Sequence, residues 1–289
     1  MTNEAEETRM ELVERLNAAL QYIERHLLRE ADSAQAARHV GLSRFYLERV
    51  FAALTDMSVS EYIRARRLTL AAQELLAGDR KVIDLALKYG YDTPESFTKA
   101  FSRFHGVTPT SARRMCTRLC CQNPLVITIK MEGAHLMNYK MEQMEAFTVV
   151  GMERMFHMDT SMQEIPKFWV EFDEKGLGKQ VTPMFGICFD GDAEGSFPYL
   201  IGERLLSGQS VAEGLVTREV PAHLWARFAC AGPMPGAIQT VTRQIYAEWL
   251  PTNGMYEVAQ SIEIEMYTAG DVTAADYYSE VWIPVKKKA

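Results

Sequence analysis

The sequence predicts two domains: an all-α domain with about seven helices in two helix-turn-helix units, and a C-terminal α+β domain. In the second domain, two strand–helix–strand–strand repeats form an antiparallel sheet with a cleft between them. Three observations predict this organisation. A chain of 289 residues exceeds the usual size of one small domain. Each part contains its own internal repeat, and the sign of the charge changes between the parts.

The charge of the chain is unevenly distributed. Residues 9–118 contain 18 Lys and Arg against 13 Asp and Glu, whereas residues 119–289 contain 13 against 22. The net charge of −7 therefore conceals a basic first part, which suits a phosphate-bearing partner. All four tryptophans lie in the acidic part. We expect a helical domain at 8–118, a linker at 119–137 and an α+β domain at 138–289.

Helical periodicity begins at residues 10–28, where apolar residues recur every three or four positions. Two segments with one shared pattern follow, residues 36–51 and 85–101. A longer helix lies between them and opens with a capping box formed by Ser58 and Glu61. This helix is expected to hold the two segments at a fixed separation.

The shared pattern is typical of a helix-turn-helix unit. Gly41 and Gly90 stand where the first helix of each unit ends and the backbone needs a positive φ. Ser43 and Thr93 are placed to cap the second helix. One such pattern arises easily by chance, but two in tandem, joined by a helix of suitable length, predict a tandem unit.

The basic domain resembles the AraC/XylS family of transcription regulators over residues 10–118. The resemblance is carried by the two units and by the closing motif Phe97-x3-Phe101-x2-Phe104-x-Gly106-x2-Pro109, with Arg113-Arg114 after it. The family resemblance implies that the second helix of each unit enters a major groove of promoter DNA. The implied DNA-binding residues are Ser43, Arg44, Phe45, Glu48, Arg49, Thr93, Glu95, Ser96, Lys99 and Arg103.

Arg49 and Lys99 are the strongest candidates for base contacts, because a long cation donates to guanine O6 and N7. Phe45 would contact a thymine methyl group, and the two capping residues would bind phosphate. Glu48 and Glu95 either accept from cytosine N4 or weaken non-specific affinity. The alternative for an individual arginine such as Arg44 or Arg103 is a solvated helix face.

The acidic part begins with a linker, in which the apolar run at 125–129 predicts a short strand. Alternating and helical patterns then predict a strand, a helix and two strands, and the same order recurs. The first set spans residues 139–154, 162–172, 184–189 and 199–206. The second set spans residues 215–229, 237–249, 261–268 and 277–285. Clefts between such repeats are favoured ligand sites.

This layout resembles the gyrase-inhibitor-like (GyrI-like) effector-binding domain over residues 138–287. The resemblance is carried by residues 221–228 (PAHLWARF) with Gly232-Pro233, and by residues 278–285 (YSEVWIPV). It implies that Glu280 recognises a cationic, aromatic effector. Buried between aromatics, a carboxylate needs a cation. The candidate effector-binding residues are Glu280, Tyr278, Trp282, Trp169, Phe185, Tyr199 and Trp225.

The alternative for Glu280 is an ion pair with one of the domain's own arginines, such as Arg204, Arg227 or Arg243. For each aromatic residue, the alternative is packing in the core. A second interpretation of the domain is a hydrolase of reactive xenobiotics, in which Glu280 and Tyr267, Tyr277 or Tyr278 position a water. A third is a module that sequesters drugs or binds another protein.

The sequence thus favours a cytoplasmic transcription regulator, an activator controlled by a small hydrophobic, cationic effector, rather than an enzyme. We expect promoter DNA, the effector and RNA polymerase as partners, no membrane, no cofactor and no catalytic residues. A monomer and a homodimer both remain open. Five cysteines lack the spacing of a disulfide framework, and we expect no metal site at Cys116, Cys120, Cys121 and His135.

Overall fold

The structure is a computed structural model that describes residues 3–28, 31–78, 80–115, 118–128, 137–179, 181–192 and 195–288. The chain divides into two compact units. One comprises residues 13–52 and 56–129, and the other comprises residues 130–289 together with 1–12 and 53–55. Among the described helices, none combines the length and apolar character needed to cross a membrane.

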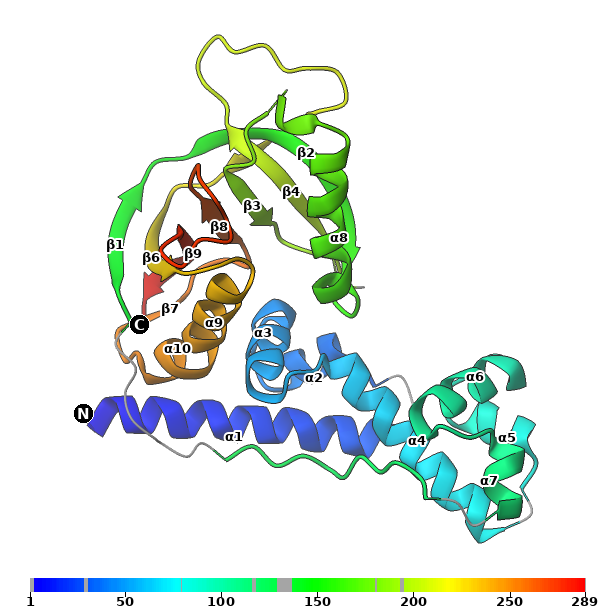
Figure 1. The fold of residues 1–289 in the computed structure, drawn as a ribbon. Helices are drawn as coiled ribbons and strands as arrows, with labels where there is room; N and C mark the ends of the chain where they lie inside the picture. Colours follow the sequence, from blue (N-terminus) through cyan, green and yellow to red (C-terminus); the bar gives the residue numbers. More distant parts are fainter. Residues whose placement is uncertain are drawn as a thin grey trace. The chain divides into compact units, whose positions relative to one another are not determined.

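Seven helices precede residue 116 in the described chain, as the sequence predicts (Figure 1). They are α1 (Asn3–His26), α2 (Ser33–His39), α3 (Arg44–Thr55), α4 (Val59–Ala77), α5 (Val82–Lys88), α6 (Pro94–His105) and α7 (Pro109–Met115). The predicted capping box opens α4: Glu61 N–H donates to the Ser58 hydroxyl oxygen, and the Glu61 carboxylate accepts from Ser58 N–H. The long helix between the two units therefore starts where its sequence predicts.

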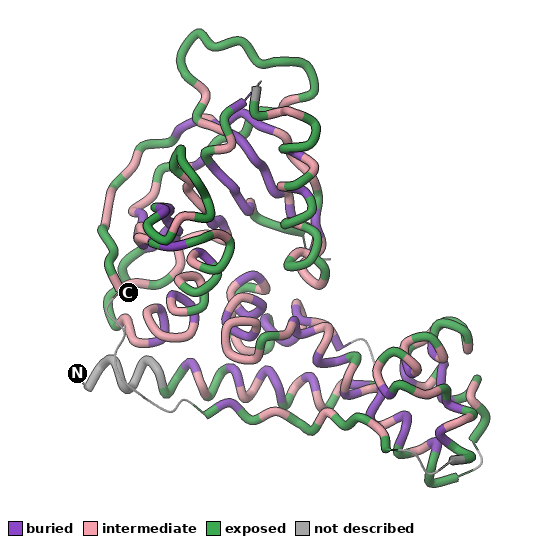
Figure 2. The backbone as a smooth tube through the Cα atoms, viewed as in Figure 1, coloured by how far each residue is buried: buried purple, intermediate pink, exposed green. Residues whose placement is uncertain are grey.

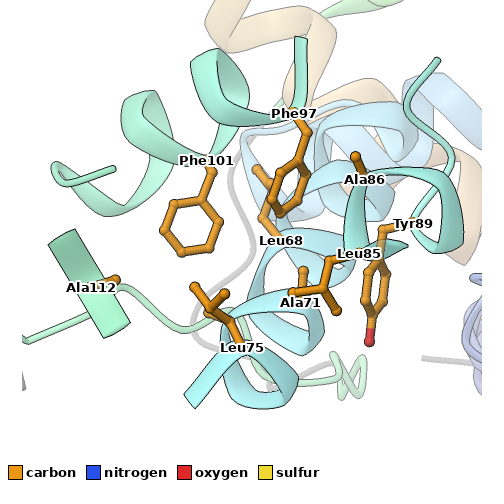
Figure 3. Close-up of a cluster of buried hydrophobic side chains, with 10 residues drawn as sticks. Leu68, Ala71, Leu75, Leu85, Ala86, Tyr89, Phe97, Phe101 and Ala112 are labelled. Atoms are coloured by element: carbon orange, nitrogen blue, oxygen red, sulfur yellow. The ribbon is translucent and has the colours of Figure 1, made fainter. Parts of the chain in front are cut away.

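The second helix-turn-helix unit has its own apolar core (Figure 3). Leu68 and Leu75 of α4 pack there with Leu85 of α5 and with Phe97 and Phe101 of α6. Each of these five side chains is at most 2% exposed. Because α4 contributes one wall of this core, α5 and α6 are fixed to the long helix.

The other compact unit, which contains residues 130–289, is built on an antiparallel sheet. The strands are β1 (Tyr139–Met144), β2 (Phe147–His157), β3 (Phe185–Cys188), β4 (Ser196–Arg204), β5 (Val216–Val220), β6 (His223–Ala231), β7 (Tyr256–Val258), β8 (Glu263–Tyr267) and β9 (Tyr278–Lys287). All four residues of β3 are buried (Figure 2), and so are Ser279 to Val285 of β9. The helices are α8 (Ser161–Glu174), a short 3₁₀ turn η1 (Leu177–Lys179), and α9 (Gly236–Gln244), which continues through the π-helical turn η2 (Ile245–Trp249) into α10 (Leu250–Thr252).

The strand order has the symmetry that two repeats imply. The order β1-β6-β9-β8-β3-β4-β2-β5 is unchanged when the halves are exchanged, with β2 corresponding to β6, β3 to β8 and β4 to β9. The pseudo-dyad therefore passes between β3 and β8, which pair with each other. The predicted antiparallel α+β fold with two repeats is confirmed.

Two predicted strands are wrong in their extent. Residues 139–154 and 215–229 each form two strands, because the chain changes its neighbours at residues 145–146 and 221–222. β1 pairs with β6 of the second repeat, and β2 pairs with β5. The repeats thus exchange their first strands, which local alternation does not reveal. The short strand β7, which pairs with β9, was not predicted.

The predicted short strand at 125–129 is also wrong in the part that the structure describes. Residues 118–128 form an extended segment without strand pairing. Backbone groups at Gln122, Leu125 and Ile127 hydrogen-bond to side chains of α1 and α4 instead of another strand. An apolar run predicts extended backbone, but the partner of that backbone depends on the tertiary structure.

Candidate DNA-binding and effector-binding sites

The two helix-turn-helix units have the same local geometry. Gly41 and Gly90 adopt φ angles of 68° and 82°, in the left-handed region where a side chain is strained. The hydroxyl of Ser43 accepts the N–H of Tyr46 at 3.1 Å, and that of Thr93 accepts the N–H of Ser96 at 3.1 Å. The predicted caps are therefore present at the second helix of each unit, α3 and α6.

The candidate residues of α6 form an open polar face. Glu95, Ser96, Lys99 and Arg103 are all exposed, while Phe97 on the same helix is fully buried. The apolar side fixes the helix to its core, and the opposite side presents a lysine and an arginine. This arrangement suits contact with a duplex. The role of these α6 residues in binding DNA stays a prediction.

The candidate residues of α3 are less exposed. Arg44 and Arg49 are half-buried, and the Arg49 guanidinium lies over the ring of Phe45 with 5.2 Å to the ring centroid. Phe45 is 6% exposed. An arginine held against an aromatic ring loses fewer rotamers on binding than a free one. Arg49 therefore remains the preferred candidate on α3.

Glu48 has a structural partner that the sequence did not suggest. It is 5% exposed, and its carboxylate accepts the N–H of Val59 at 3.3 Å, at the start of α4. A carboxylate there also interacts favourably with the positive end of the α4 dipole. The position favours a role in joining α3 to α4 over a base contact.

Glu280 lies in a polar cluster on the sheet. Its carboxylate accepts from Arg227 (Nη2 at 2.6 Å), Tyr278 (Oη at 2.6 Å) and Trp282 (Nε1 at 2.6 Å). Arg227 also pairs with Glu142 at 2.7 Å. Burial alone would raise the pKa of Glu280, but the three donors outweigh it and hold the pKa below its usual value. Of the alternatives, the structure contains the ion pair with Arg227.

A second carboxylate cluster lies around Glu265 of β8. The phenol groups of Tyr199 and Tyr267 both donate to its Oε2, at 3.0 and 2.9 Å. Trp169 of α8 donates its indole N–H to the Tyr199 oxygen at 2.9 Å, and its ring lies 4.9 Å from that of Tyr267. Burial and the nearby carboxylate raise the pKa of both tyrosines well above the usual range, so the phenols remain donors.

Backbone packing supports the Glu265 cluster. A Cβ on Gly186 would lie 2.2 Å from the Tyr199 oxygen and 3.1 Å from the Glu265 carboxylate. Because position 186 of β3 has no side chain, there is room for the hydrogen bond between Tyr199 and Glu265. Glu265 is half-buried, whereas Glu280 is 4% exposed. Glu265 is the more accessible of the two carboxylates.

The two carboxylate clusters lie on opposite faces of the sheet. Glu280 is opposite Met266 in the antiparallel register, and Met266 is opposite Phe185, so these three share a face. Glu265 precedes Met266 and therefore lies on the other face. α8 covers the Glu265 face, and so does η2, whose Tyr246 donates to Glu263 at 2.8 Å.

The seven predicted effector-binding residues are therefore divided between two faces. Trp169 and Tyr199 belong to the Glu265 cluster. The other five lie on the Glu280 face: Glu280, Tyr278, Trp282, Phe185 and Trp225. Phe185, Trp225 and Trp282 are core residues there, at most 4% exposed. One ligand cannot contact all seven.

Sequence reasoning missed Glu265 and gave Tyr267 only to the hydrolase alternative. The spacing Glu263-x-Glu265-x-Tyr267 within the predicted strand at 261–268 contained the signal. Alternate residues of a strand share a face, so two carboxylates and a phenol were placed together. The sequence did not reveal that α8 covers this face.

The cysteines give no sign of a shared site in the described chain. Cys120 and Cys121 are exposed, and Cys188 and Cys230 are buried. Cys116 and His135 lie outside the described residues. Within the described ranges, no group of three or more His, Cys, Asp or Glu residues is placed to hold a metal ion.

Two family models match this chain. Residues 140–285 match the integron-associated effector binding proteins, and residues 36–115 match a helix-turn-helix domain. The first match covers just over half of the 289 residues. The chain belongs to the integron-associated effector binding family, with an AraC-type helix-turn-helix domain before it. The predicted resemblances to AraC-type and GyrI-like domains are thereby confirmed.

Individual relatives match the two parts separately. The transcriptional activator AarP of Providencia stuartii is 38% identical over 98 residues, covering 34% of this chain and 73% of AarP. The regulatory protein SoxS of Salmonella typhimurium is 34% identical over 98 residues, covering 34% of this chain and 92% of SoxS. The solved structure of SAV2435 bound to tetraphenylphosphonium matches 52% of this chain and 94% of that one, with 22% identity and a TM-score of 0.46.

Proposed function

We propose that this protein is a transcription activator that places α3 and α6 in successive major grooves of promoter DNA and responds to a small effector. One observation carries the DNA-binding part: two units with equivalent glycine turns and capped second helices are attached to one long helix, α4. Arg49 and Lys99 occupy equivalent positions and supply the principal base contacts. The relatives named as regulators and activators support this assignment.

A binding assay tests the DNA contacts. Selection from a random-sequence duplex library identifies the preferred site of the full chain. On that site, Arg49→Ala and Lys99→Ala are each expected to weaken binding by about 1–3 kcal/mol and to relax specificity at one base pair. Lys167→Ala removes an equal charge from an exposed position on α8 and serves as control. Unchanged affinity in the double variant would show that α3 and α6 do not read the DNA.

The Glu265 cluster is the better candidate for the effector. Its carboxylate is half-buried, and the rings of Trp169, Tyr199 and Tyr267 lie around it. A carboxylate surrounded by π-faces suits a delocalised, aromatic cation. The Glu280 carboxylate is only 4% exposed and is paired with Arg227. A contact between Glu280 and the effector stays a prediction, and the ion pair with Arg227 argues against it.

Tetraphenylphosphonium is a suitable probe, since Trp169 reports its arrival by fluorescence. Glu265→Gln is expected to raise the Kd about tenfold or more, which corresponds to about 1.4 kcal/mol. Glu219→Gln, at an exposed position of β5, serves as a charge-matched control. If Glu280→Gln rather than Glu265→Gln abolished binding, the effector would lie on the other face. Slow chemical turnover of an electrophilic substrate by the same site would favour the hydrolase alternative.

Activation requires RNA polymerase as a partner. A protein that acts on promoter DNA would be located in the cytoplasm. Transcription from the selected site, measured with purified polymerase with and without the protein, tests activation. A fall in transcript would show a repressor instead. Sedimentation of the protein–DNA complex distinguishes a monomer from a homodimer.

A further inference from the structure

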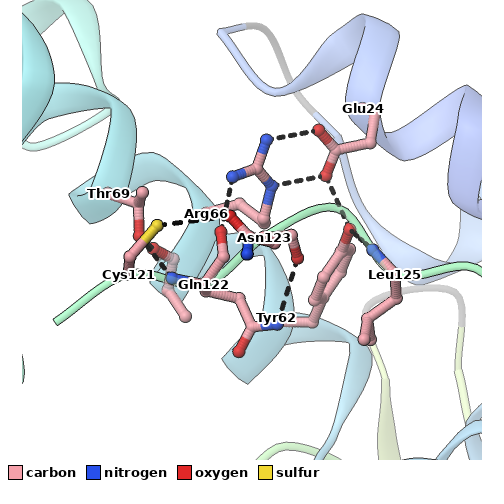
Figure 4. Close-up of polar contacts among 9 residues, drawn as sticks. Glu24, Tyr62, Arg66, Thr69, Cys121, Gln122, Asn123 and Leu125 are labelled. Atoms are coloured by element: carbon pink, nitrogen blue, oxygen red, sulfur yellow. Dashed lines mark hydrogen bonds and ion pairs between the residues drawn. The ribbon is translucent and has the colours of Figure 1, made fainter.

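The extended segment 118–128 is docked along the helical unit by side chains that bind its backbone (Figure 4). Gln122 N–H donates to the Thr69 hydroxyl at 2.9 Å, and Gln122 C=O accepts from Arg66 Nη1 at 2.5 Å. Leu125 N–H donates to the Tyr62 oxygen at 3.1 Å. The segment is therefore fixed to α4 at two places along its length.

The same segment is fixed to α1. The amide side chain of Asn17 accepts the N–H of Ile127 at 2.9 Å and donates to its C=O at 2.9 Å. Both backbone groups of one residue are thus paired by one side chain, as a neighbouring strand would pair them. Ile127 is 8% exposed, so its side chain adds apolar burial to these bonds.

The anchoring side chains belong to a network that also joins α1 to α4. Arg66 donates through Nε and Nη2 to the two carboxylate oxygens of Glu24, each at 2.8 Å, and Tyr62 donates to Glu24 at 2.7 Å. The Arg66 side chain is 8% exposed. Its third nitrogen donor is used by the segment. A bidentate pair in this position holds the guanidinium plane in one orientation.

The segment also reaches the second helix-turn-helix unit. Leu119 packs against the core formed by α4, α5 and α6. From there the segment passes along α4 to α1, which precedes the first unit. Tyr22 of α1 donates to Gln35 of α2 at 3.1 Å, so α1 is attached to the first unit. The segment therefore links the second unit, along α4, to a helix that contacts the first unit, and the chain after it leads to the effector-binding domain.

We propose that residues 118–128 are a brace that holds the two helix-turn-helix units at a fixed spacing and transmits the effector state to α1 and α4. The proposal rests on the proposed function, since it explains how DNA binding by two units is kept in register and controlled. A brace held by backbone bonds either stays docked or is released as a whole, and release leaves α4 alone to set the spacing of α3 and α6. A displacement at its far end acts first on the bonds of Asn17 to Ile127.

Asn17→Ala in the full chain tests the brace, because it removes both bonds to Ile127 and leaves the pair of Glu24 and Arg66 in place. Hydrogen exchange at the Ile127 amide is expected to accelerate at least tenfold, and affinity for the selected two-groove duplex to fall about tenfold. Affinity for a shorter duplex, which offers a major-groove site to only one of the two units, should be unchanged. Asn17→Asp keeps the acceptor for the Ile127 N–H, so its exchange rate and its DNA affinity should lie between those of Asn17→Ala and wild type. Gln21→Ala, exposed on the same helix, is the control.

Several outcomes separate the possibilities. Faster exchange at Ile127 with unchanged two-groove affinity would overturn the brace, and so would an equal loss on both duplexes. Unchanged exchange would show that Asn17 does not hold the segment. A wild-type chain that binds no duplex would refute the proposed function instead. Circular dichroism at 222 nm identifies a variant that fails to fold, in which case Asn17→Asp decides.

Tetraphenylphosphonium tests the transmission. Saturating probe is expected to change the exchange of the Ile127 amide in wild type and to have a smaller effect on DNA affinity in Asn17→Ala. Probe that binds, as judged by tryptophan fluorescence, without altering exchange at Ile127 or DNA affinity would overturn this part. Failure of the probe to bind would refute the cationic effector class, and the DNA measurements would still judge the brace.

Discussion

Replacing Arg227 by methionine should show how much the Glu280 cluster contributes to the free energy of unfolding of the effector-binding domain. In the wild type, Arg227 Cζ lies 4.1 Å from the centroid of the Trp282 ring. Methionine keeps much of the aliphatic packing over this ring. The change leaves Glu280, whose side chain is 5% exposed, with two neutral donors and no cation. Removing one partner of a buried ion pair typically costs about 3–5 kcal/mol. We expect a loss of this order in the stability of the effector-binding domain.

The pH dependence follows from the same contacts. In the wild type, the pKa of Glu280 is below its ordinary value of 4.5, so this group stabilises the fold above pH 4.5 and less as pH falls through its folded pKa. When Arg227 is removed, we expect burial to outweigh the two remaining donors, Tyr278 and Trp282, and to raise the folded pKa of Glu280 above the unfolded one. Protonation then relieves the destabilisation, and the difference between variant and wild type should shrink as pH falls.

Tryptophan fluorescence follows this domain selectively, since Trp169, Trp225, Trp249 and Trp282 are the only tryptophans of the chain. Urea unfolding at pH 7 and pH 5 gives the free energies of unfolding. Adding Glu280→Gln to Arg227→Met should recover part of the loss, because the uncompensated charge disappears. A loss below about 1 kcal/mol at pH 7, or strictly additive effects in the double variant, would refute the reasoning.

Three further changes test other parts of the structure. Phe101→Ala should cost about 3–5 kcal/mol by opening a cavity in the core of the second helix-turn-helix unit, and a helical signal that melts at an unchanged temperature would contradict this. Thr93→Ala removes the cap of α6 and should cost about 0.5–2 kcal/mol in the same melt, with Thr110→Ala at an exposed position as comparison. Gly186→Ala forces its Cβ against the Tyr199 oxygen, so tetraphenylphosphonium affinity should fall as in Glu265→Gln; wild-type affinity would show that Tyr199 and Glu265 do not form the effector site.

The helix-turn-helix units could be predicted because their determinants are local. A positive-φ glycine, a capping hydroxyl three residues before the N–H it accepts, and apolar residues at helical spacing all act within a few residues. Among the candidate DNA-binding residues, Glu48 is an exception. Its partner, Val59 N–H, lies eleven residues away across a turn, and no local pattern indicates it.

The sequence by itself determined the two repeats, the alternation within each strand and hence which residues share a face. Only the tertiary structure decided which face α8 covers, that Arg227 pairs with Glu280, and that Glu265 is more accessible than Glu280. It also decided where the 118–128 segment docks, since Asn17 and Ile127 are 110 residues apart. The physical reason is the same in each case. Alternation and capping are set by backbone geometry over a few residues, whereas ion pairs and backbone docking depend on which distant elements meet.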